Sequence, residues 1–339
     1  MKLVATKDAI GCVLCHDMTR IIPGVSKGAA FKKGHIVTEE DIEVLLSMGK
    51  ENLYVWENDD TMLHEDEAAF KLCSLCKNEH MYTGQLSEGK IELFADCDGV
   101  LKVNDSLLKM VNAAGEMMIA TRHGNFPVKK GDKLAGMRII PLVIKKDKIN
   151  KVLSECEGKG LILKLMPYKK NKATIITTGS EVASGRIKDA FTPVIKDKLK
   201  EYDIEIINHT LIADNSEEIT SQIKEDIASG ANIVLCTGGM SVDPDDKTPK
   251  AIKNTGADIV TYGAPVLPGA MFLLSYLDSA AVMGLPGCVM YAKRTIFDLV
   301  LPRIAAGEVL TKEDFERLGQ GGLCLGCDIC TFPNCGFGK

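Results

Sequence analysis

NIVLCTGGMSVDPDDKTP, residues 232–249, is the most informative stretch of the chain. An apolar run of strand length stops at two glycines, and three carboxylates, Asp243, Asp245 and Asp246, follow closely. A strand that is apolar throughout is typical of a parallel sheet that helices cover on both faces. The stretch therefore predicts a central strand that ends in a glycine turn beside an acidic loop.

The sequence on either side alternates strands and helices. An apolar run at 173–179 and a second strand at 204–209 come before the central strand, and helices are expected at 192–202 and 215–229. This order predicts an α/β domain with a mainly parallel sheet. Two more strands and a last helix complete the domain, at 272–277, 279–284 and 289–305.

Capping residues give the expected helix starts. Thr192 and Pro193 suit the N-cap and first position of one helix, and Asn215 suits the N-cap of the next. Thr248 is expected to cap a helix that begins at Pro249.

The first half of the chain is mixed α+β and rich in strands. Thr38, with Asp41 three residues later, predicts a helix start. Further helices are expected at 64–78 and 147–156, and Asp98-Gly99 indicates a β-hairpin within a mainly β region. We expect four regions: an α+β segment 1–62, a linker helix and β-rich subdomain 63–168, the α/β domain 172–310, and a cysteine-rich tail 311–339.

Composition limits the possible partners. The chain has 339 residues, a net charge of −5 and a pI near 5.8, so nucleic acid is not an expected partner. No apolar run approaches the ~20 residues of a membrane span, and the N-terminus lacks the apolar core of a signal peptide. We therefore expect a cytoplasmic protein whose twelve cysteines are reduced and are either buried or metal-bound. Burial is expected for the pair Cys73/Cys76. The pair Cys12/Cys15 is either a chance match to a haem-attachment motif or a buried pair.

Three predicted strands end in glycine-containing turns. Ligands of open α/β sheets bind outside the carboxyl ends of the strands, where turn amides can hold phosphate. The alternative is that each turn only needs the backbone freedom of glycine. The two common nucleotide motifs, GxGxxG and GxxxxGK[ST], are absent. The expected ligand contacts are Thr178, Gly179, Ser180, Glu181, Thr237, Gly238, Gly239, Met240, Ser241, Pro286 and Gly287.

The acidic loop needs a cation if a phosphate binds beside it. A carboxylate ~4 Å from a phosphate costs about 1 kcal/mol in water, and more when partly buried. Mg²⁺ bridging carboxylate and phosphate removes this repulsion, so Asp243, Asp245 and Asp246 are predicted to hold Mg²⁺. Lys247 would add a fixed positive charge, and Thr248 would lie in the same site. The alternative is a solvated acidic loop.

Three motifs resemble those of the molybdopterin-binding domain of molybdenum cofactor biosynthesis proteins. They are TTGSEVASGRIKD (177–189), TGGMSVDPDDKTP (237–249) and GLPG (284–287), and the resemblance covers about residues 172–306. It implies a three-layer α/β domain that binds molybdopterin, or its adenylylated form, at the strand ends. Ser180 and Glu181 would then contact the pterin or nucleotide. FKKGHIVTEEDIEVLLSMGKENLYV (31–55) also resembles the linker and helix of the molybdenum-insertion members.

The motifs do not single out one reaction. Insertion enzymes usually continue the Gly-Gly loop as Val-Ser-x-Gly-x-x-Asp, whereas residues 246–249 resemble the adenylyltransferase branch. Cys288 and Val289 stand where insertion enzymes commonly have Asn-Pro, and their C-terminal β domain has no counterpart. The resemblance implies Mg²⁺-dependent metal insertion or adenylyl handling. A non-enzymatic cofactor carrier and a nucleotide pyrophosphatase related to damage-inducible hydrolases are the alternatives. A homodimer is favoured, and molybdoenzymes are possible partners.

The tail CLGCDICTFPNCGFGK, residues 324–339, has four cysteines at C-x2-C-x2-C-x4-C spacing. Iron–sulfur proteins use a close relative of this run, C-x2-C-x2-C-x3-C-P. The tail has four large apolar residues, each worth about 1.5–3 kcal/mol if buried, against a backbone cost of about 1–2 kcal/mol for every ordered residue. Metal ligation by Cys324, Cys327, Cys330 and Cys335 is therefore predicted, with an iron–sulfur cluster favoured over Zn²⁺. The alternative is an inert tail, docked or disordered, with free thiols.

Overall fold

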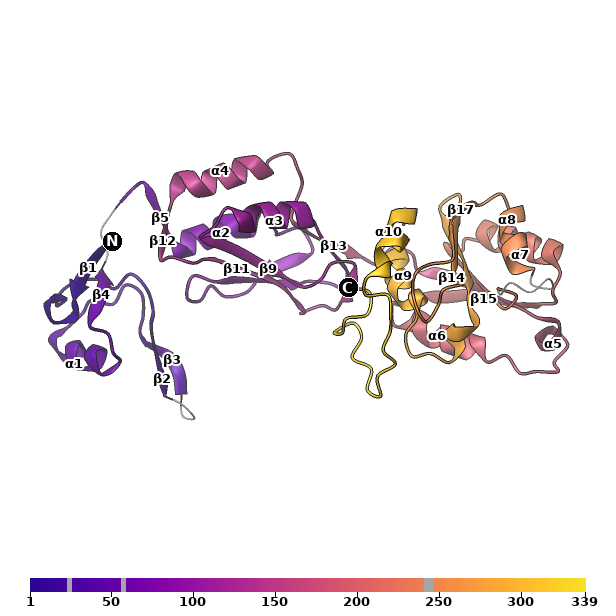
Figure 1. The fold of residues 1–339 in the computed structure, drawn as a ribbon, viewed down its shortest axis with the longest axis horizontal. Coiled ribbons are helices and arrows are strands. Elements are labelled where there is room, and N and C mark those ends of the chain that lie inside the picture. Colours follow the sequence, from indigo (N-terminus) through magenta and orange to yellow (C-terminus); the bar gives the residue numbers. More distant parts are fainter. Residues whose placement is uncertain (23–25, 56–58, 241–246) are drawn as a thin grey trace. The chain divides into compact units, whose positions relative to one another are not determined.

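The computed structural model describes residues 1–22, 26–55, 59–240 and 247–339 (Figure 1). The chain divides into two compact units. The first unit holds residues 1–94, 103–122 and 133–164, and the second holds 95–102, 123–132 and 165–339. Among the described residues, no helix has both the length and the apolar composition to cross a membrane.

The first unit begins with a small α+β segment around Leu14, Leu45 and Leu53, all fully or almost fully buried. The expected capping box is confirmed, since Asp41 accepts from the Thr38 backbone N–H at 2.8 Å. β1 pairs with β4 and β2 with β3, both antiparallel. The elements are β1 Lys2–Ala5, β2 Met18–Ile22, β3 Ser26–Phe31, α1 Glu39–Ser47 and β4 Asn52–Val55, with a 3-10 turn at Thr6–Asp8.

The rest of the first unit is a four-stranded sheet, β6-β7-β11-β9, with α2 and α3 on one face (Figure 1). Helices near the expected ranges 64–78 and 147–156 are present as α2 and α4, whereas α3 was not foreseen. Cys73 and Cys76 are buried as predicted, and burial raises the pKa of Cys76 to about 12. The elements are β5 Met62–His64, α2 Glu65–Ser74, β6 Met81–Thr83, β7 Ile91–Ala95, α3 Asp105–Ala113, β9 Met117–Thr121, β11 Lys133–Ile139, β12 Val143–Lys145 and α4 Lys146–Cys156.

The predicted hairpin at Asp98-Gly99 is wrong. The strand after it, β8 (Gly99–Val103), does not pair with β7 but joins β10 (Phe126–Val128) and β13 (Leu163–Pro167) in another sheet. Gly99 serves close packing instead, because a Cβ there would lie 2.3 Å from the backbone oxygen of Met166.

The second unit is the predicted α/β domain. Its six-stranded sheet has the order β15-β14-β16-β19-β18-β17. The first four strands are parallel. β18 runs antiparallel to β19, and β17 runs antiparallel to β18, so only β18 opposes the direction of the first four strands. The strands are β14 Lys172–Thr178, β15 Glu205–Ile212, β16 Ile233–Thr237, β17 Asp258–Tyr262, β18 Leu273–Leu277 and β19 Ala280–Leu285. The helices are α5 Ser180–Ala183, α6 Phe191–Lys200, α7 Ser216–Ala228, α8 Thr248–Asn254, α9 Ile296–Ala305 and α10 Lys312–Glu316, with 3-10 turns at Gly287–Met290 and Arg317–Gly319.

Helices cover both faces of this sheet, which confirms the three-layer architecture. Ile175 and Leu235 pack in one core with α6 and α9. Their chain neighbours Ile176 and Cys236 pack in a second core with α7 and α8. Successive residues of a strand point to opposite faces, so a strand buried on both faces must be apolar at every position.

Helices α6 and α9 of this domain begin elsewhere than predicted, and α8 begins one residue earlier. Asn215 caps α7 as expected, by accepting from the backbone of Glu217. However, α6 starts one residue before Thr192, because the Asp189 carboxylate accepts its first amides at 2.9 and 3.0 Å. The last helix does not start near 289 but at Ile296, after a capping box formed by Thr295.

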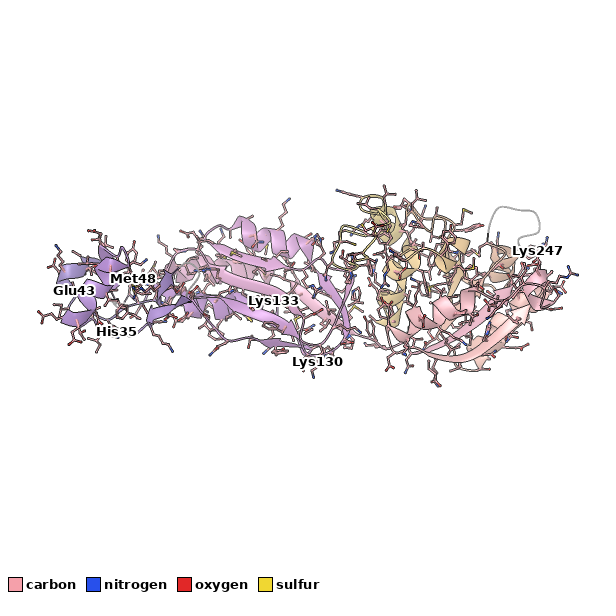
Figure 2. The ribbon with its side chains drawn as sticks, turned by 90° about the horizontal axis from the view of Figure 1, so that it is seen from below. His35, Glu43, Met48, Lys130, Lys133 and Lys247 are labelled. Carbon is pink, nitrogen blue, oxygen red and sulfur yellow. The ribbon has the colours of Figure 1, made fainter. Side chains whose placement is uncertain are left out.

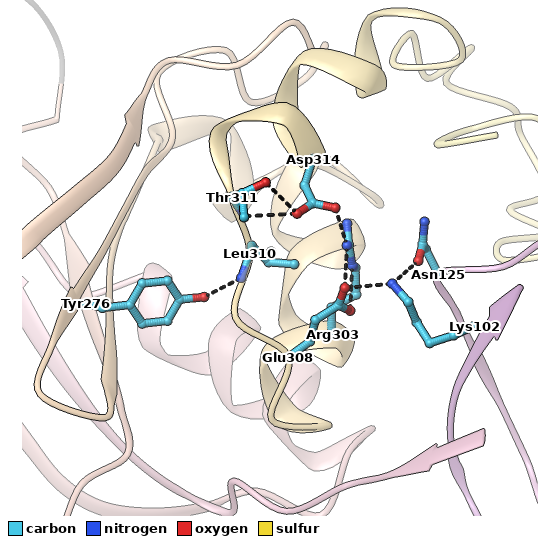
Figure 3. Close-up of polar contacts among 8 residues, drawn as sticks. All are labelled: Lys102, Asn125, Tyr276, Arg303, Glu308, Leu310, Thr311 and Asp314. Atoms are coloured by element: carbon cyan, nitrogen blue, oxygen red, sulfur yellow. Dashed lines mark hydrogen bonds and ion pairs between the residues drawn. The ribbon is translucent and has the colours of Figure 1, made fainter. Parts of the chain in front are cut away.

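A buried ion cluster joins α9 to the segments around it (Figure 3). Arg303, 5% exposed, donates to Glu308 at 2.7 and 2.9 Å and to Asp314 at 2.6 Å. Lys102, from β8, donates to Glu308 at 2.6 Å and also to Asn125. Burial acts to raise the pKa of Glu308, but the hydrogen bond and charge of Arg303 outweigh it and lower the value.

Candidate functional site

Three glycine turns lie side by side at one edge of the sheet. β14, β16 and β19 are adjacent and parallel, with Thr177 opposite Thr237 and Thr237 opposite Leu285. The turns at Gly179, Gly238 and Gly287 therefore follow the carboxyl ends of three neighbouring strands. The predicted position of Gly238 and Gly239 directly after a central strand is confirmed.

The Gly238-Gly239 turn packs directly on the end of β14. Gly238 has φ +84°, and a Cβ there would lie 2.3 Å from the backbone oxygen of Thr178. Gly239 has φ +54°, and its Cβ would lie 3.0 Å from the Oγ1 of Thr248. Any residue but glycine would strain this backbone and push the two strand ends apart. Thr237, by contrast, has a fully buried hydroxyl without a partner among the described residues.

Thr248 holds the turn in place rather than capping the helix as predicted. It is the first residue of α8, and Lys247 occupies the N-cap position (Figure 2). The Thr248 hydroxyl donates to the Gly238 carbonyl at 2.9 Å and lies 3.2 Å from the Thr178 hydroxyl. Both ends of the loop between Gly238 and Thr248 are thereby fixed. Ser241, Asp243, Asp245 and Asp246, which were predicted to lie in this site, are outside the described residues.

The turn after β14 is already engaged with a carboxylate. Gly179, at φ +136°, donates its N–H to the Ile212 carbonyl at 3.2 Å. The backbone N–H and the hydroxyl of Ser180 both donate to Asp214, each at 2.9 Å. Glu181 is exposed. A phosphate could reach the Ser180 donors only by displacing Asp214, or by sharing a cation with it.

The turn after β19 leaves room beside it. Pro286 is buried and Gly287 is exposed, and a Cβ at Gly287 would meet no atom within 4 Å. Met240 has a different place from the one predicted, because its side chain is buried in the core. It packs onto Gly284, where a Cβ would lie 2.5 Å from the Met240 sulfur. Met240 thus supports the turns from below instead of offering a ligand contact.

A polar group that the sequence did not reveal lies beside this edge, between β14 and β15. His209 is 3.1 Å from the Thr177 hydroxyl, 3.0 Å from the Thr192 hydroxyl and 3.5 Å from the Asp189 carboxylate. Burial lowers the pKa of His209 despite the nearby Asp189. Burial acts to raise the pKa of Asp189, but hydrogen bonds from Thr192 and Phe191 outweigh it and lower the value. At neutral pH the pair is therefore a neutral imidazole beside a carboxylate.

The four tail cysteines do not surround a single ion. Cys324 and Cys335 are half-buried, whereas Cys327 and Cys330 are exposed. Throughout the described ranges, no three His, Cys, Asp or Glu side chains are grouped so that they could hold one metal ion. The tail is nevertheless docked, since Phe337 is 4% exposed within the core of the second unit.

Two family models match the chain. Residues 174–306 match one described as "Probable molybdopterin binding domain", and residues 3–57 match one described as a domain of unknown function. The first match contains all three glycine turns.

Several curated proteins are similar over parts of the chain. A "Molybdenum cofactor biosynthesis bifunctional protein" of Synechococcus elongatus is 36% identical over 85 residues, which cover 25% of this chain and 27% of that protein. A "Molybdopterin molybdenumtransferase" of Haemophilus influenzae is 31% identical over 147 residues, or 41% of this chain and 35% of that protein. A "CinA-like protein" of Mycobacterium avium is 32% identical over 81 residues, or 24% of this chain and 19% of that protein. The chain thus spans between 19% and 35% of these relatives' lengths.

A solved structure with a similar domain is the tungsten cofactor synthesizing protein MoaB from Pyrococcus furiosus. It is 22% identical, and the likeness covers 36% of this chain and 84% of that chain with a TM-score of 0.31.

Proposed function

We propose that residues 174–306, which belong to the molybdopterin-binding domain family, bind molybdopterin or its adenylylated form, and that the protein acts in maturation of the molybdenum cofactor. The observation that carries the proposal is the row of glycine turns at the ends of β14, β16 and β19. Ligands of open α/β sheets bind at this edge, and a family with a pterin ligand accounts for the row better than turn geometry alone. The names of two relatives, a cofactor biosynthesis protein and a molybdenumtransferase, support the same ligand.

The charges of the edge favour a phosphate that arrives with a cation. Asp214 faces the donors of Ser180, and three more aspartates belong to the loop after Gly239. These carboxylates would repel a bare phosphate by about 1 kcal/mol each at ~4 Å in water. Mg²⁺ shared between carboxylates and phosphate would turn the repulsion into attraction. Lys247, at the start of α8, would add a fixed positive charge to the same site.

Three activities are compatible with this ligand, and each predicts a different result. Metal insertion or adenylyl handling would give metal release with adenylate hydrolysis, and a carrier would give binding without turnover. A nucleotide pyrophosphatase would cleave free dinucleotides. The similarity to a CinA-like protein is the reason for including this third activity. A metal centre at the tail cysteines would be a second, independent function, because no tail cysteine belongs to the three turns.

The test has two steps. Protein purified without oxygen is expected to carry a pterin, which is identified after oxidation by its fluorescence. Titration calorimetry then compares molybdopterin binding with and without Mg²⁺ for the protein and for Asp245→Asn/Asp246→Asn. Each carboxylate that is lost takes away at least about 1 kcal/mol of net attraction for the bound Mg²⁺, so the double variant should bind molybdopterin roughly 30-fold more weakly in Mg²⁺.

The matched control is Asp59→Asn/Asp60→Asn, which removes an adjacent, exposed pair of aspartates in the first unit. It should bind like the unchanged protein. Equal binding by all three proteins in Mg²⁺ would mean that the loop acids are only solvated. Absence of any pterin binding would refute the proposed ligand.

A further inference from the structure

The tail is a closed loop fixed at both ends. Gly338 donates its N–H to the Gly321 carbonyl at 2.9 Å, and Leu267 exchanges hydrogen bonds of 2.8 Å with Gly322 and Cys324. A Cβ at Gly321 would lie 2.0 Å from the backbone oxygen of Lys339, so the closure requires glycine there. The sixteen residues with the cysteines are thus held in one shape by backbone contacts on either side.

Two cations of the α/β domain hold the middle of the loop. The Lys293 ammonium donates to the carbonyl of Asp328 at 2.7 Å and to that of Cys327 at 3.2 Å. The Arg294 guanidinium lies 5.0 Å from the centre of the Phe332 ring. The carbonyl of the second cysteine and the ring between the third and fourth are therefore each fixed by a side chain from outside the tail.

All four cysteines line one cavity between the loop and the domain. Its volume is about 390 Å³, and its walls include Lys293, Arg294, Phe332 and Phe337 besides the four thiol-bearing residues. A cavity of about 10–15 Å³ is already large enough to hold one water molecule. The space is therefore much too large for one ion, and it falls in the size range of pockets for multi-atom ligands.

We propose that this cavity binds an iron–sulfur cluster of the [4Fe–4S] type, ligated by Cys324, Cys327, Cys330 and Cys335. Three cysteines at x2 spacing match the run that supplies three ligands to one such cluster. Cys335, which lines the same cavity, would supply the fourth ligand. Each thiol loses its proton to solvent and forms one iron–sulfur bond. Two ferric ions, two ferrous ions and four sulfides from solution make up the [4Fe–4S]2+ core, so assembly needs no oxidant or reductant. The positive charge of Lys293 at the wall offsets part of the negative charge that four thiolates bring, whereas Arg294 is already paired with Glu201 and Asp298.

Zinc fits this arrangement less well than a cluster. A structural zinc needs four ligands at about 2.3 Å from one point. The thiols instead border a wide space, and no three side chains of the described part of the chain converge on one ion. A cluster has its four irons at separate corners, so its thiolates stay well apart. The proposal rests on the tail alone and holds whether or not the α/β domain binds a pterin.

The test measures composition, not activity. The full chain is purified without oxygen, treated with equal amounts of ferrous and ferric iron and with sulfide, desalted and assayed for iron, sulfide and zinc. About four iron and four sulfide per chain are expected, with broad visible absorbance that bleaches when dithionite is added. Binding of zinc with no iron or sulfide would overturn the proposal, and so would a chain that takes up neither metal.

Variants assign the ligands. Cys327→Ser/Cys330→Ser should lose iron, sulfide and visible absorbance while keeping the far-UV circular dichroism of the unchanged protein, because both side chains are exposed. Cys12→Ser/Cys97→Ser removes two half-buried cysteines outside the tail and should retain the cluster in full. Equal iron content in the two double variants would overturn the assignment. Pterin binding, measured separately, should be the same in both.

Discussion

Replacing Gly238 by alanine tests the packing of the candidate site without removing a polar side chain. Gly238 has φ +84°, and the new methyl would lie 2.3 Å from the Thr178 carbonyl oxygen and 2.9 Å from its hydroxyl. The nearer atom belongs to the backbone of β14, which cannot rotate away as a side chain could. The substitution must therefore separate the ends of two central strands.

The expected cost has two parts. The left-handed backbone conformation costs an alanine about 1–2 kcal/mol. Forcing a methyl into a packed site usually adds about 1–3 kcal/mol. Gly256, which follows α8, separates the two parts, since it has φ +87° and no atom within 4 Å of its Cβ position. Gly256→Ala should cost only the first part, and Gly238→Ala about 2–5 kcal/mol in all.

The assay is equilibrium unfolding in urea, followed by near-UV circular dichroism, to which the buried Tyr202 of the second unit contributes. Gly238→Ala should have the lower midpoint at an unchanged slope, which identifies a loss of stability rather than a change in the unfolded chain. Equal midpoints for the two variants would refute the reasoning, because they would show that Gly238 does not touch the end of β14.

Two further predictions concern titratable groups. The pKa of Glu308 is lowered in the folded protein, so its contribution is full above the unfolded value near 4.5 and is lost as the pH falls through the folded value. Glu308→Gln should cost about 3 kcal/mol at neutral pH, because Arg303 loses a buried partner, and should flatten the acid limb of a stability–pH curve. In metal-free protein, peptide mapping after treatment with iodoacetamide should find Cys327 and Cys330 modified first and Cys236 last, since burial raises the Cys236 pKa to about 12. Early modification of Cys236 would contradict the packing of β16.

The central strands could be predicted because a strand buried on both faces has apolar residues at successive positions, which the sequence shows directly. After the exposed Lys172, β14 and β16 contain only apolar residues and threonines. Asn215 caps α7 with a side chain that contacts its own chain neighbours. The sequence Asp98-Gly99 wrongly indicated a hairpin turn. Its glycine is required instead by close packing against Met166, which lies far along the chain. α3 was missed although Asn104 caps it, since the strand-like sequence around it dominated.

The candidate site was predictable only in part for a related reason. The glycine turns follow their own strands directly and could be located from the sequence. The engagement of Ser180 by Asp214 spans 34 residues, and it depends on β14 and β15 being neighbours in the sheet. His209 lies within a strand, in a run with no marker of its own, so nothing local connects it with Asp189. Met240 was misassigned because the partner that buries it, Gly284, belongs to the neighbouring strand β19.

The division of the chain has a consequence for dissecting the protein. Two stretches of the second unit, 95–102 and 123–132, are encoded within the sequence of the first. A fragment that starts at residue 165 would lack Lys102 and Phe126, and so would further expose the half-buried Glu308 and open the core beside Phe337. The intact second unit therefore includes two segments that the ribosome synthesises well before the strands of the α/β sheet.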